Sequence, residues 1–151
     1  MDTKELRDLL NSDPAIRKHL RGVFAADEKP QMPLCYPCAY VFNTDKKNKP
    51  GSHWIVLYAE NKKSVEYFDS YGTHPFKALY GFAKTLGERV VYNTKWLQGP
   101  ATWVCGAYCV YFLHFRCRGY TFGDIVGHFD EYDWKKNDTL VGDVVQVLCE
   151  S

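Results

Sequence analysis

The sequence predicts an α+β fold in which a buried central helix packs on a largely antiparallel sheet. Residues 39–43, 53–59 and 64–69 are rich in β-branched and aromatic residues and are bounded by polar turn residues, which indicates strands joined by hairpins. Residues 105–115 are almost continuously apolar, which indicates a helix buried on nearly every side. The 151 residues, 46% of them hydrophobic, suffice for a single domain spanning 1–151.

Helical patterns are expected before the strand-forming runs. Leucines at helical spacing follow Asp2 and Thr3, either of which can cap the first turn of a helix. A second helix is expected to begin at Pro14 and to run to about Leu20, before Gly22 ends it. The chain should then enter a loop.

Further elements are expected after the third strand. Residues 75–86 have a helical composition, and residues 89–92 indicate a short strand. Two amphipathic helices should complete the chain. Thr121 can cap the first, which would end near Phe129, and one of residues 137–139 can cap the second.

Composition excludes several classes of function. The chain has 19 Lys and Arg against 18 Asp and Glu, so its net charge of +1 creates no strong field for nucleic acid or acidic membranes. We expect no membrane contact and no secretion, because there is no long apolar run and the N-terminus is charged. Six cysteines in a chain this apolar indicate reduced thiols in a cytosolic or nuclear compartment rather than a disulfide framework.

A histidine and an aspartate are expected to meet at the end of a hairpin. If the chain turns at residues 60–63, Leu57 lies opposite Val65 and His53 lies opposite Asp69. Directly opposed residues of an antiparallel pair have Cβ atoms about 4.5–5.5 Å apart, which allows an imidazole to bind a carboxylate. Such a pair fixes the imidazole tautomer, as a general base requires.

A nucleophile and an oxyanion donor follow later in the chain. Cys105 opens the buried helix, where backbone N–H groups and the helix dipole favour a thiolate. The turn at Gly99-Pro100 can fold the amide of Gln98 back toward the helix start, where its NH2 group can stabilise an oxyanion. Each residue alone also has a structural explanation, since a buried cysteine is often only a small hydrophobe. The order His, Asp, Gln, Cys favours the catalytic interpretation.

The motifs at these positions resemble those of the adenain-like cysteine proteases, the group that includes adenovirus maturation proteases and shares its fold with ubiquitin-like protein deconjugases. The motifs are Pro50-Gly51-Ser52-His53-Trp54, Phe68-Asp69-Ser70-Tyr71-Gly72, Leu97-Gln98 and Cys105-Gly106-Ala107-Tyr108-Cys109-Val110. Residues 22–25 and 42–45 also look like elements of proteases from adenovirus-like and Polinton-type elements. The resemblance implies the papain-like fold of the adenain branch, with nucleophile Cys105, base His53, orienting Asp69, oxyanion donor Gln98 and Trp54 flanking the base.

The resemblance also implies a function. We expect a cysteine endopeptidase that cleaves precursor proteins through a thioester, as in virion maturation, without a cofactor. Its expected location is the host nucleus or cytoplasm, and also the virion if the protein is viral. The alternative is a deconjugase of a ubiquitin-like modifier. The chain has no cysteine between Asp69 and Cys105, where adenovirus proteases hold one that is disulfide-linked to an activating peptide. The residues leave open whether an activating peptide or DNA is needed.

Three other features receive structural interpretations. The pair Cys35 and Cys38 has the spacing of half a zinc site, but no second pair follows at a suitable distance, so no metal is expected. Cys109 lies one helical turn after Cys105, where packing is expected and resolution of an oxidised nucleophile is the alternative. The basic residues 46–49 are expected to form a solvated loop, with nucleic-acid contact as the alternative.

Overall fold

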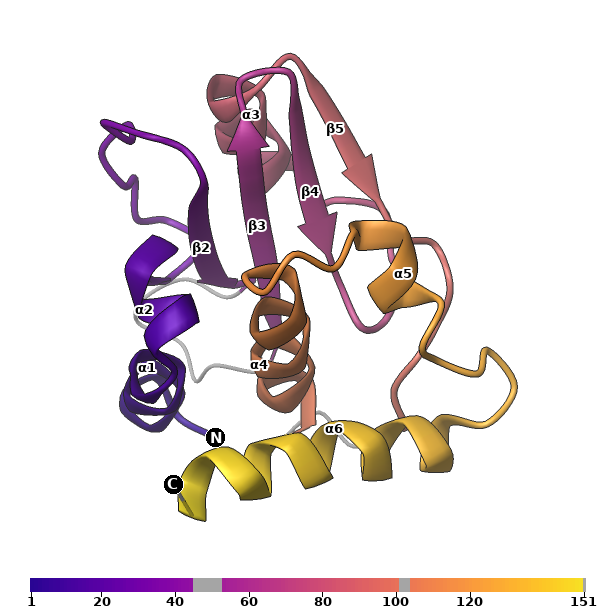
Figure 1. Ribbon diagram of the computed structural model, residues 1–151. Coiled ribbons are helices and arrows are strands. Elements are labelled where there is room, and N and C mark those ends of the chain that lie inside the picture. The colour runs from indigo at the N-terminus through magenta and orange to yellow at the C-terminus, as the bar shows by residue number, and fades with distance from the viewer. Residues whose placement is uncertain (45–52, 101–103, 151) are drawn as a thin grey trace.

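A computed structural model describes residues 1–44, 53–100 and 104–150 of the chain. Its elements in chain order are α1 (Thr3–Ser12), α2 (Pro14–His19), β1 (Leu20–Phe24), β2 (Cys38–Asn43), β3 (Trp54–Asn61), β4 (Ser64–Phe68), α3 (Lys77–Leu86), β5 (Arg89–Tyr92), α4 (Cys105–Arg116), α5 (Phe122–Val126) and α6 (Trp134–Glu150). The strands form one sheet in the order β1-β2-β3-β4-β5. Strands β2 to β5 are labelled in Figure 1. The central strands β2, β3 and β4 pair antiparallel, while β1 and β5 join the two edges in parallel. The expected α+β fold is therefore confirmed.

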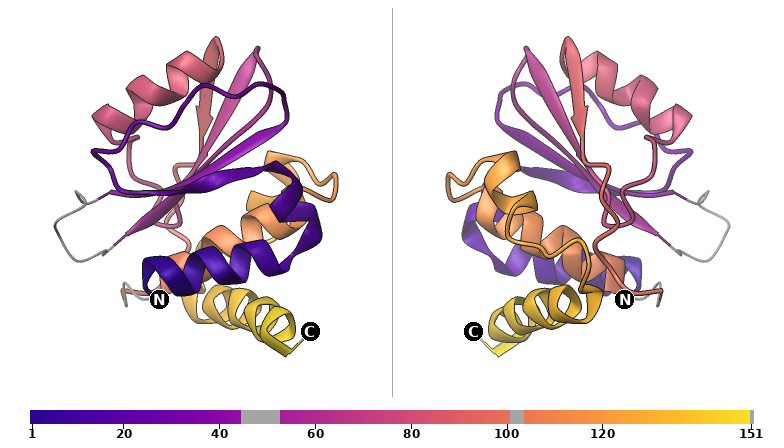
Figure 2. Two further views of the ribbon diagram at one scale, coloured as in Figure 1. Left: turned by 90° about the vertical axis from the view of Figure 1, so that its left-hand side faces the viewer. Right: turned by 90° about the vertical axis from the view of Figure 1, so that its right-hand side faces the viewer.

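Helices cover both faces of the sheet. Helix α3 lies on one face, and α1, α4 and α6 lie on the other (Figure 2). The side chains of strand β3 point alternately to the two faces of the sheet, and each face has its own hydrophobic core. Trp54, Val56 and Tyr58 belong to the core under α4, and the residues between them belong to the core under α3. Burial on both sides explains why the strand reads as a nearly continuous apolar run.

Helix α4 is the central buried helix that the sequence predicts. It lies against β3 on one side and contacts α6 on the other (Figures 1 and 2). The ring of Phe112 stacks on that of Phe68 with centroids 4.6 Å apart. At the C-terminal end of the helix, Arg116 Nε donates to Glu66 Oε1 at 2.8 Å. These contacts anchor the helix to β4, so its first residue has a defined position relative to the sheet. No helix in the described ranges is long and apolar enough to span a membrane.

The hairpin between β3 and β4 has a different register from the predicted one. Leu57 lies opposite Tyr67 rather than Val65, and a bulge lies between Ala59 and Asn61. The turn is tighter than expected because the Asn61 side chain accepts a hydrogen bond, at 2.9 Å, from the backbone N–H two residues later. The register therefore moves by two residues, which leaves every side chain on its expected face.

The N-terminal part differs from the prediction in one element. Helix α1 begins as expected, with the Asp2 side chain accepting from the backbone N–H of Glu5. Helix α2 ends at His19, and the chain continues directly into β1, which the pattern does not predict. Gly22 has φ +150° and lies within this strand rather than simply ending a helix. The strand forms because β2 offers a long-range parallel partner.

The C-terminal helices start and stop at different residues from those expected. Thr121 caps α5 through a capping box, as predicted, but the helix ends at Val126 rather than near Phe129. Helix α6 begins at Trp134, before all three predicted caps. The Asp133 side chain accepts from a backbone N–H of the first turn at 3.1 Å. The predicted caps at 137–139 therefore lie inside α6, which frees two of them to bind other parts of the chain.

Candidate active site

The three side chains predicted as a triad lie where the start of β3, the end of β4 and the start of α4 come together. His53 precedes β3, Asp69 follows β4, and Cys105 is the first residue of α4. His53 Nε2 lies 2.7 Å from Asp69 Oδ1. Cys105 Sγ accepts a hydrogen bond from the backbone N–H of Trp54 at 3.4 Å, which places the sulfur beside the residue that follows His53. The structure thus brings the three residues into one cluster.

The second ring nitrogen of His53 is available to the sulfur. Nδ1 is buried and has no conventional hydrogen-bond partner in the part of the chain that the structure describes. Only about a seventh of the side chain is exposed, with a relative accessibility of 14%. An imidazole held at Nε2 by a carboxylate and free at Nδ1 can exchange a proton with a neighbouring thiol.

Two hydrogen bonds besides that of His53 hold the carboxylate of Asp69. The backbone N–H of Tyr71 donates to Oδ1 at 2.8 Å, and Thr73 Oγ1 donates to Oδ2 at 2.5 Å. Asn93, which follows β5, binds the backbone of Asp69 in both directions, with its Oδ1 3.0 Å from the amide nitrogen and its Nδ2 2.6 Å from the carbonyl oxygen. The carboxylate therefore has a fixed direction, as orientation of a catalytic imidazole requires.

The electrostatics of the cluster favour a charged imidazole. Burial by itself lowers the pKa of His53, but the hydrogen bond to Asp69 and the interaction with Cys105 outweigh burial and raise the pKa to about 9. Burial raises the pKa of Asp69, but the hydrogen bond and charge of His53 outweigh burial and lower it below its ordinary value. The pair is therefore an imidazolium and a carboxylate at neutral pH.

Gln98 is fully buried close to the first turns of α4. Tyr108, one turn after Cys105, donates its hydroxyl to the carbonyl oxygen of Leu97 at 3.1 Å. The same hydroxyl lies 2.6 Å from Asp138 Oδ1, and both oxygens of this carboxylate accept from the backbone N–H of Gly99 at 3.3 Å. Helices α4 and α6 thus hold the segment that carries Gln98 from both sides.

Aromatic side chains extend from the histidine toward solvent. The ring of Tyr71 lies 4.7 Å from that of His53, and Trp96 packs edge-on against Tyr71 at 5.2 Å with 57% of its surface exposed. The side chain of Trp54, predicted to flank the base, is buried in the core under α4. Its backbone N–H makes the contact with Cys105 described above.

Sequence reasoning missed the supporting residues Ser70, Thr73, Asn93, Tyr108 and Asp138. A local signal exists for Thr73, because an Asp followed by a tight turn commonly accepts hydrogen bonds from the next few residues. The contact of Asn93 depends on the parallel pairing of β4 with β5, and that of Asp138 depends on where α6 packs. Neither contact has a local signal.

The remaining cysteines lie apart from this cluster or have raised pKa values. Burial raises the pKa of the Cys109 thiol well above its ordinary value, and this side chain packs in the core as expected. Cys35 is exposed and Cys38 is buried, and burial raises the pKa of Cys38. In the described ranges, no three His, Cys, Asp or Glu side chains gather closely enough to hold a metal ion.

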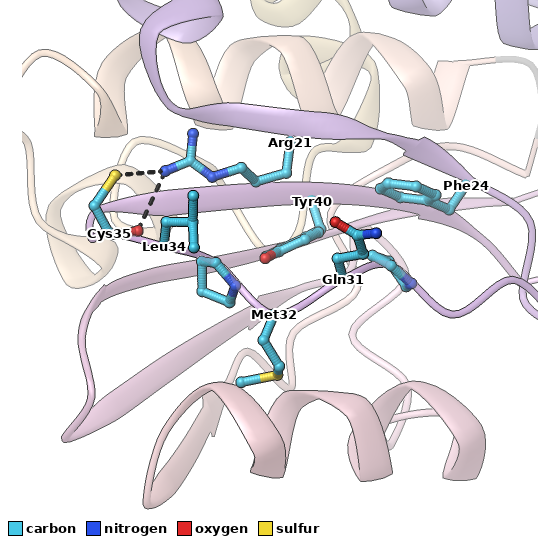
Figure 3. A pocket seen from close by; sticks show the side chains of 9 residues that line it. Arg21, Phe24, Gln31, Met32, Leu34, Cys35 and Tyr40 are labelled. Carbon is cyan, nitrogen blue, oxygen red and sulfur yellow. Dashed lines mark hydrogen bonds between the residues drawn. The ribbon is translucent and has the colours of Figure 1, made fainter.

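A cavity of about 500 Å³ lies near the exposed Cys35 (Figure 3). Arg21 reaches over it and donates to the carbonyl oxygen of Cys35 at 3.2 Å, while the Tyr40 ring forms part of the wall. Tyr40 belongs to the core under α3, so the cavity lies on the face of the sheet opposite to α4 and outside the Cys105 cluster. The basic stretch 46–49 and the start of the motif before His53 lie outside the described residues.

Sequence comparison finds viral proteases. A protease of Bovine adenovirus 2 is 33% identical over 91 residues, which is 51% of this chain and 44% of that protein. A thiol protease homologue of Acanthamoeba polyphaga mimivirus is 28% identical over 101 residues, which is 60% of this chain and 33% of that protein. The chain therefore spans less than half the length of the curated relatives it matches. No protein-family model matches it.

Solved structures share the fold of this chain at low sequence identity. A protease of ASFV superimposes with a TM-score of 0.57 at 14% identity, covering 80% of this chain and 60% of that one. The central domain of a Legionella pneumophila protein superimposes with a TM-score of 0.59 at 16% identity, covering 100% and 98%. The sequence and fold similarities agree with the motifs. The chain is therefore similar in sequence to viral proteases over part of their length, and its motifs resemble those of the adenain-like cysteine proteases.

Proposed function

We propose that this protein is a cysteine endopeptidase that cleaves precursor proteins, as in the maturation of a virion of a virus or virus-like transposon. The observation that carries the proposal is the position of His53, which binds Asp69 through one ring nitrogen and leaves the other, buried and unpaired, for Cys105. The similarity to two viral proteases supports the same conclusion.

The proposed reaction is acyl transfer through a thioester. The Cys105 thiolate attacks the carbonyl carbon of the scissile peptide bond, and the oxygen becomes an oxyanion that accepts hydrogen bonds from Gln98 Nε2 and the backbone N–H of Cys105. The C–N bond then breaks, and the imidazolium of His53 gives its proton to the leaving amine. Water, deprotonated by the neutral imidazole, hydrolyses the thioester and restores the thiol, while Asp69 holds the imidazole throughout.

The wider setting is part of the proposal. Residues 1–151 act as one protease domain, because both hydrophobic cores share a single sheet. The proposed site of action is the host nucleus or cytoplasm, and also the virion if the protein is viral. An activating peptide or DNA is a further part of the proposal. Activation by DNA is tested by adding a polyanion and by varying salt, since binding to DNA weakens steeply as salt rises.

Alkylation tests the assembly of the site. The protein is treated briefly with iodoacetamide at mildly acidic pH, and the adducts are located by mass spectrometry. We expect one fast adduct on Cys105, absent in Cys105→Ala and slow in His53→Ala, while the exposed Cys35 and Cys149 react slowly in every variant. Equal labelling of the exposed cysteines and Cys105 contradicts an activated nucleophile.

Substrate profiling tests the reaction class. Wild-type protein and Cys105→Ala are incubated with a peptide library made from a host-cell proteome, and new N-termini are sequenced. Cleavage by the wild type alone supports an endopeptidase. A ubiquitin-like probe with a C-terminal electrophile is the matched assay for the deconjugase alternative, and labelling of Cys105 by this probe without any peptide cleavage would overturn the maturation role.

A further inference from the structure

A buried hydrogen bond joins the segment after β4 to the segment before α4. Ser70 Oγ donates to Gln98 Oε1. Ser70 is 1% exposed and Gln98 is 0% exposed, so water does not compete for this contact. It links the residue next to Asp69 with the residue proposed to bind the oxyanion.

This bond determines which end of the amide can act as a donor. Gln98 Nε2 lies 3.4 Å from the carbonyl oxygen of Gly99, while Oε1 faces the hydroxyl of Ser70. If the amide were rotated by half a turn, Oε1 would lie against the Gly99 carbonyl oxygen, and two acceptors would face each other. The serine hydroxyl and the glycine carbonyl therefore select the same orientation, with the NH2 group on the side away from Ser70.

The backbone of Ser70 reinforces its side chain. The carbonyl oxygen of Ser70 accepts from the backbone N–H of Leu97 at 2.8 Å and from that of Gln98 at 3.3 Å. Ser70 thus holds both the main chain and the side chain of Gln98. The preceding residue, Asp69, holds His53. Two adjacent residues after one strand therefore contact the general base and the oxyanion donor.

We propose that Ser70 is a positioning residue that orients the Gln98 amide for the oxyanion. The inference rests on the proposed function, because the oxyanion forms only when the Cys105 sulfur attacks a carbonyl group. By occupying Oε1, the hydroxyl prevents the glutamine from presenting its acceptor to the negative charge. The hydroxyl of Ser70 binds the amide of Gln98, so its proposed role is exerted through Gln98 and leaves the reactivity of the thiolate unchanged.

The test is a double-mutant cycle on Ser70 and Gln98. The substrate is a peptide identified as cleaved by the wild type. We expect Ser70→Ala to lower kcat about tenfold with little change in KM, because an oxyanion donor acts mainly on the transition state. Ser70→Thr, which retains the hydroxyl, should recover most of the rate. In a Gln98→Ala background, Ser70→Ala should cause no further loss.

Two controls separate positioning from a structural effect. The rate of Cys105 alkylation should be the same in Ser70→Ala and in the wild type, since alkylation forms no oxyanion. Ser64→Ala removes a hydroxyl at the other end of β4, about 20 Å along the chain from Ser70, and should leave both rates unchanged. If Ser70→Ala does not fold, Ser70→Cys replaces it, because the thiol has a similar size and is a much weaker donor.

The outcomes distinguish the inference from the proposed function. Full kcat in Ser70→Ala, or losses in Ser70→Ala and Gln98→Ala that multiply in the double variant, would overturn the role of Ser70 while leaving the protease intact. Slower alkylation in Ser70→Ala would also overturn it, because the effect would then pass through Asp69 and His53. Absence of any Cys105-dependent cleavage by the wild type would overturn the proposed function and this inference together.

Discussion

Replacing Asp69 with asparagine tests the role of its charge separately from its shape. Oδ1 accepts from both His53 and the backbone of Tyr71, so the amide oxygen of an asparagine takes this position. The NH2 group then faces Thr73, whose hydroxyl can rotate to accept. The hydrogen bonds are kept while the negative charge is lost.

The expected effect depends on pH. In the wild type the pKa of His53 is about 9, and without the carboxylate it should fall toward its ordinary value of 6.5, because burial opposes the charge. For a fall to 6.5, the imidazolium fraction at pH 8 drops from about 90% to about 3%, a loss of roughly 30-fold. At pH 6 the imidazolium fraction drops only from nearly 100% to about three quarters.

The assay is kcat/KM against pH for a cleaved peptide. The leaving amine needs a proton from the imidazolium, so the wild-type rate should fall above about pH 9, and the Asp69→Asn rate should fall from about pH 6.5 upward. Asp69→Ala serves as control, since it loses the orientation of His53 and should be impaired at every pH. An Asp69→Asn loss of the same size at pH 6 and pH 8 would refute the electrostatic reasoning.

Three further predictions concern stability, each measured by urea unfolding. The raised pKa of His53 stabilises the fold fully below pH 6.5 and this contribution is lost as pH rises through about 9, whereas the lowered pKa of Asp69 stabilises it above pH 3.8 and this contribution is lost in acid. The stability lost in His53→Ala should therefore be largest between pH 3.8 and pH 6.5, where both contributions are present. A loss of stability that does not depend on pH would contradict the ion pair between His53 and Asp69. Arg116→Ala leaves the carboxylate of Glu66, which is only 13% exposed, without its cation and should cost about 3 kcal/mol; a change below about 0.5 kcal/mol would show that the pair is effectively solvated. Gly72→Ala places a Cβ 2.4 Å from a backbone carbonyl oxygen at φ +64°, so it should destabilise the protein by more than about 1 kcal/mol, and an unchanged midpoint would contradict this strain.

The sequence was sufficient to predict that His53, Asp69 and Cys105 lie close together, although it misplaced the hairpin. His53 and Asp69 are in contact although the predicted register was wrong by two residues. Residues diagonal to each other across two strands are about 7–8 Å apart, and their side chains can bridge this distance. The alternation of side chains is also unchanged by an even shift. Local patterns therefore predicted which residues approach each other better than they predicted the strand pairing itself.

The parts that escaped prediction depend on distant partners. Strand β1 forms on an edge that β2 provides, and no periodicity in its five residues distinguishes it from the end of α2. The caps predicted within residues 137–139 are good capping residues by type, but Asn137 donates to the carbonyl oxygen of Leu97 and Asp138 binds Tyr108. Their identities reflect the support of the Gln98 segment rather than the start of a helix.

The bulged turn between β3 and β4 limits how this hairpin can change in length. Inserting or deleting two residues there slides β4 along β3 but keeps Tyr67 under α3 and Phe68 under α4. Inserting or deleting one residue would exchange these two layers and carry Asp69 away from His53, unless a new bulge absorbed the change. Functional variants of this hairpin should therefore differ in length by even numbers of residues, or carry an extra bulge wherever they differ by an odd number.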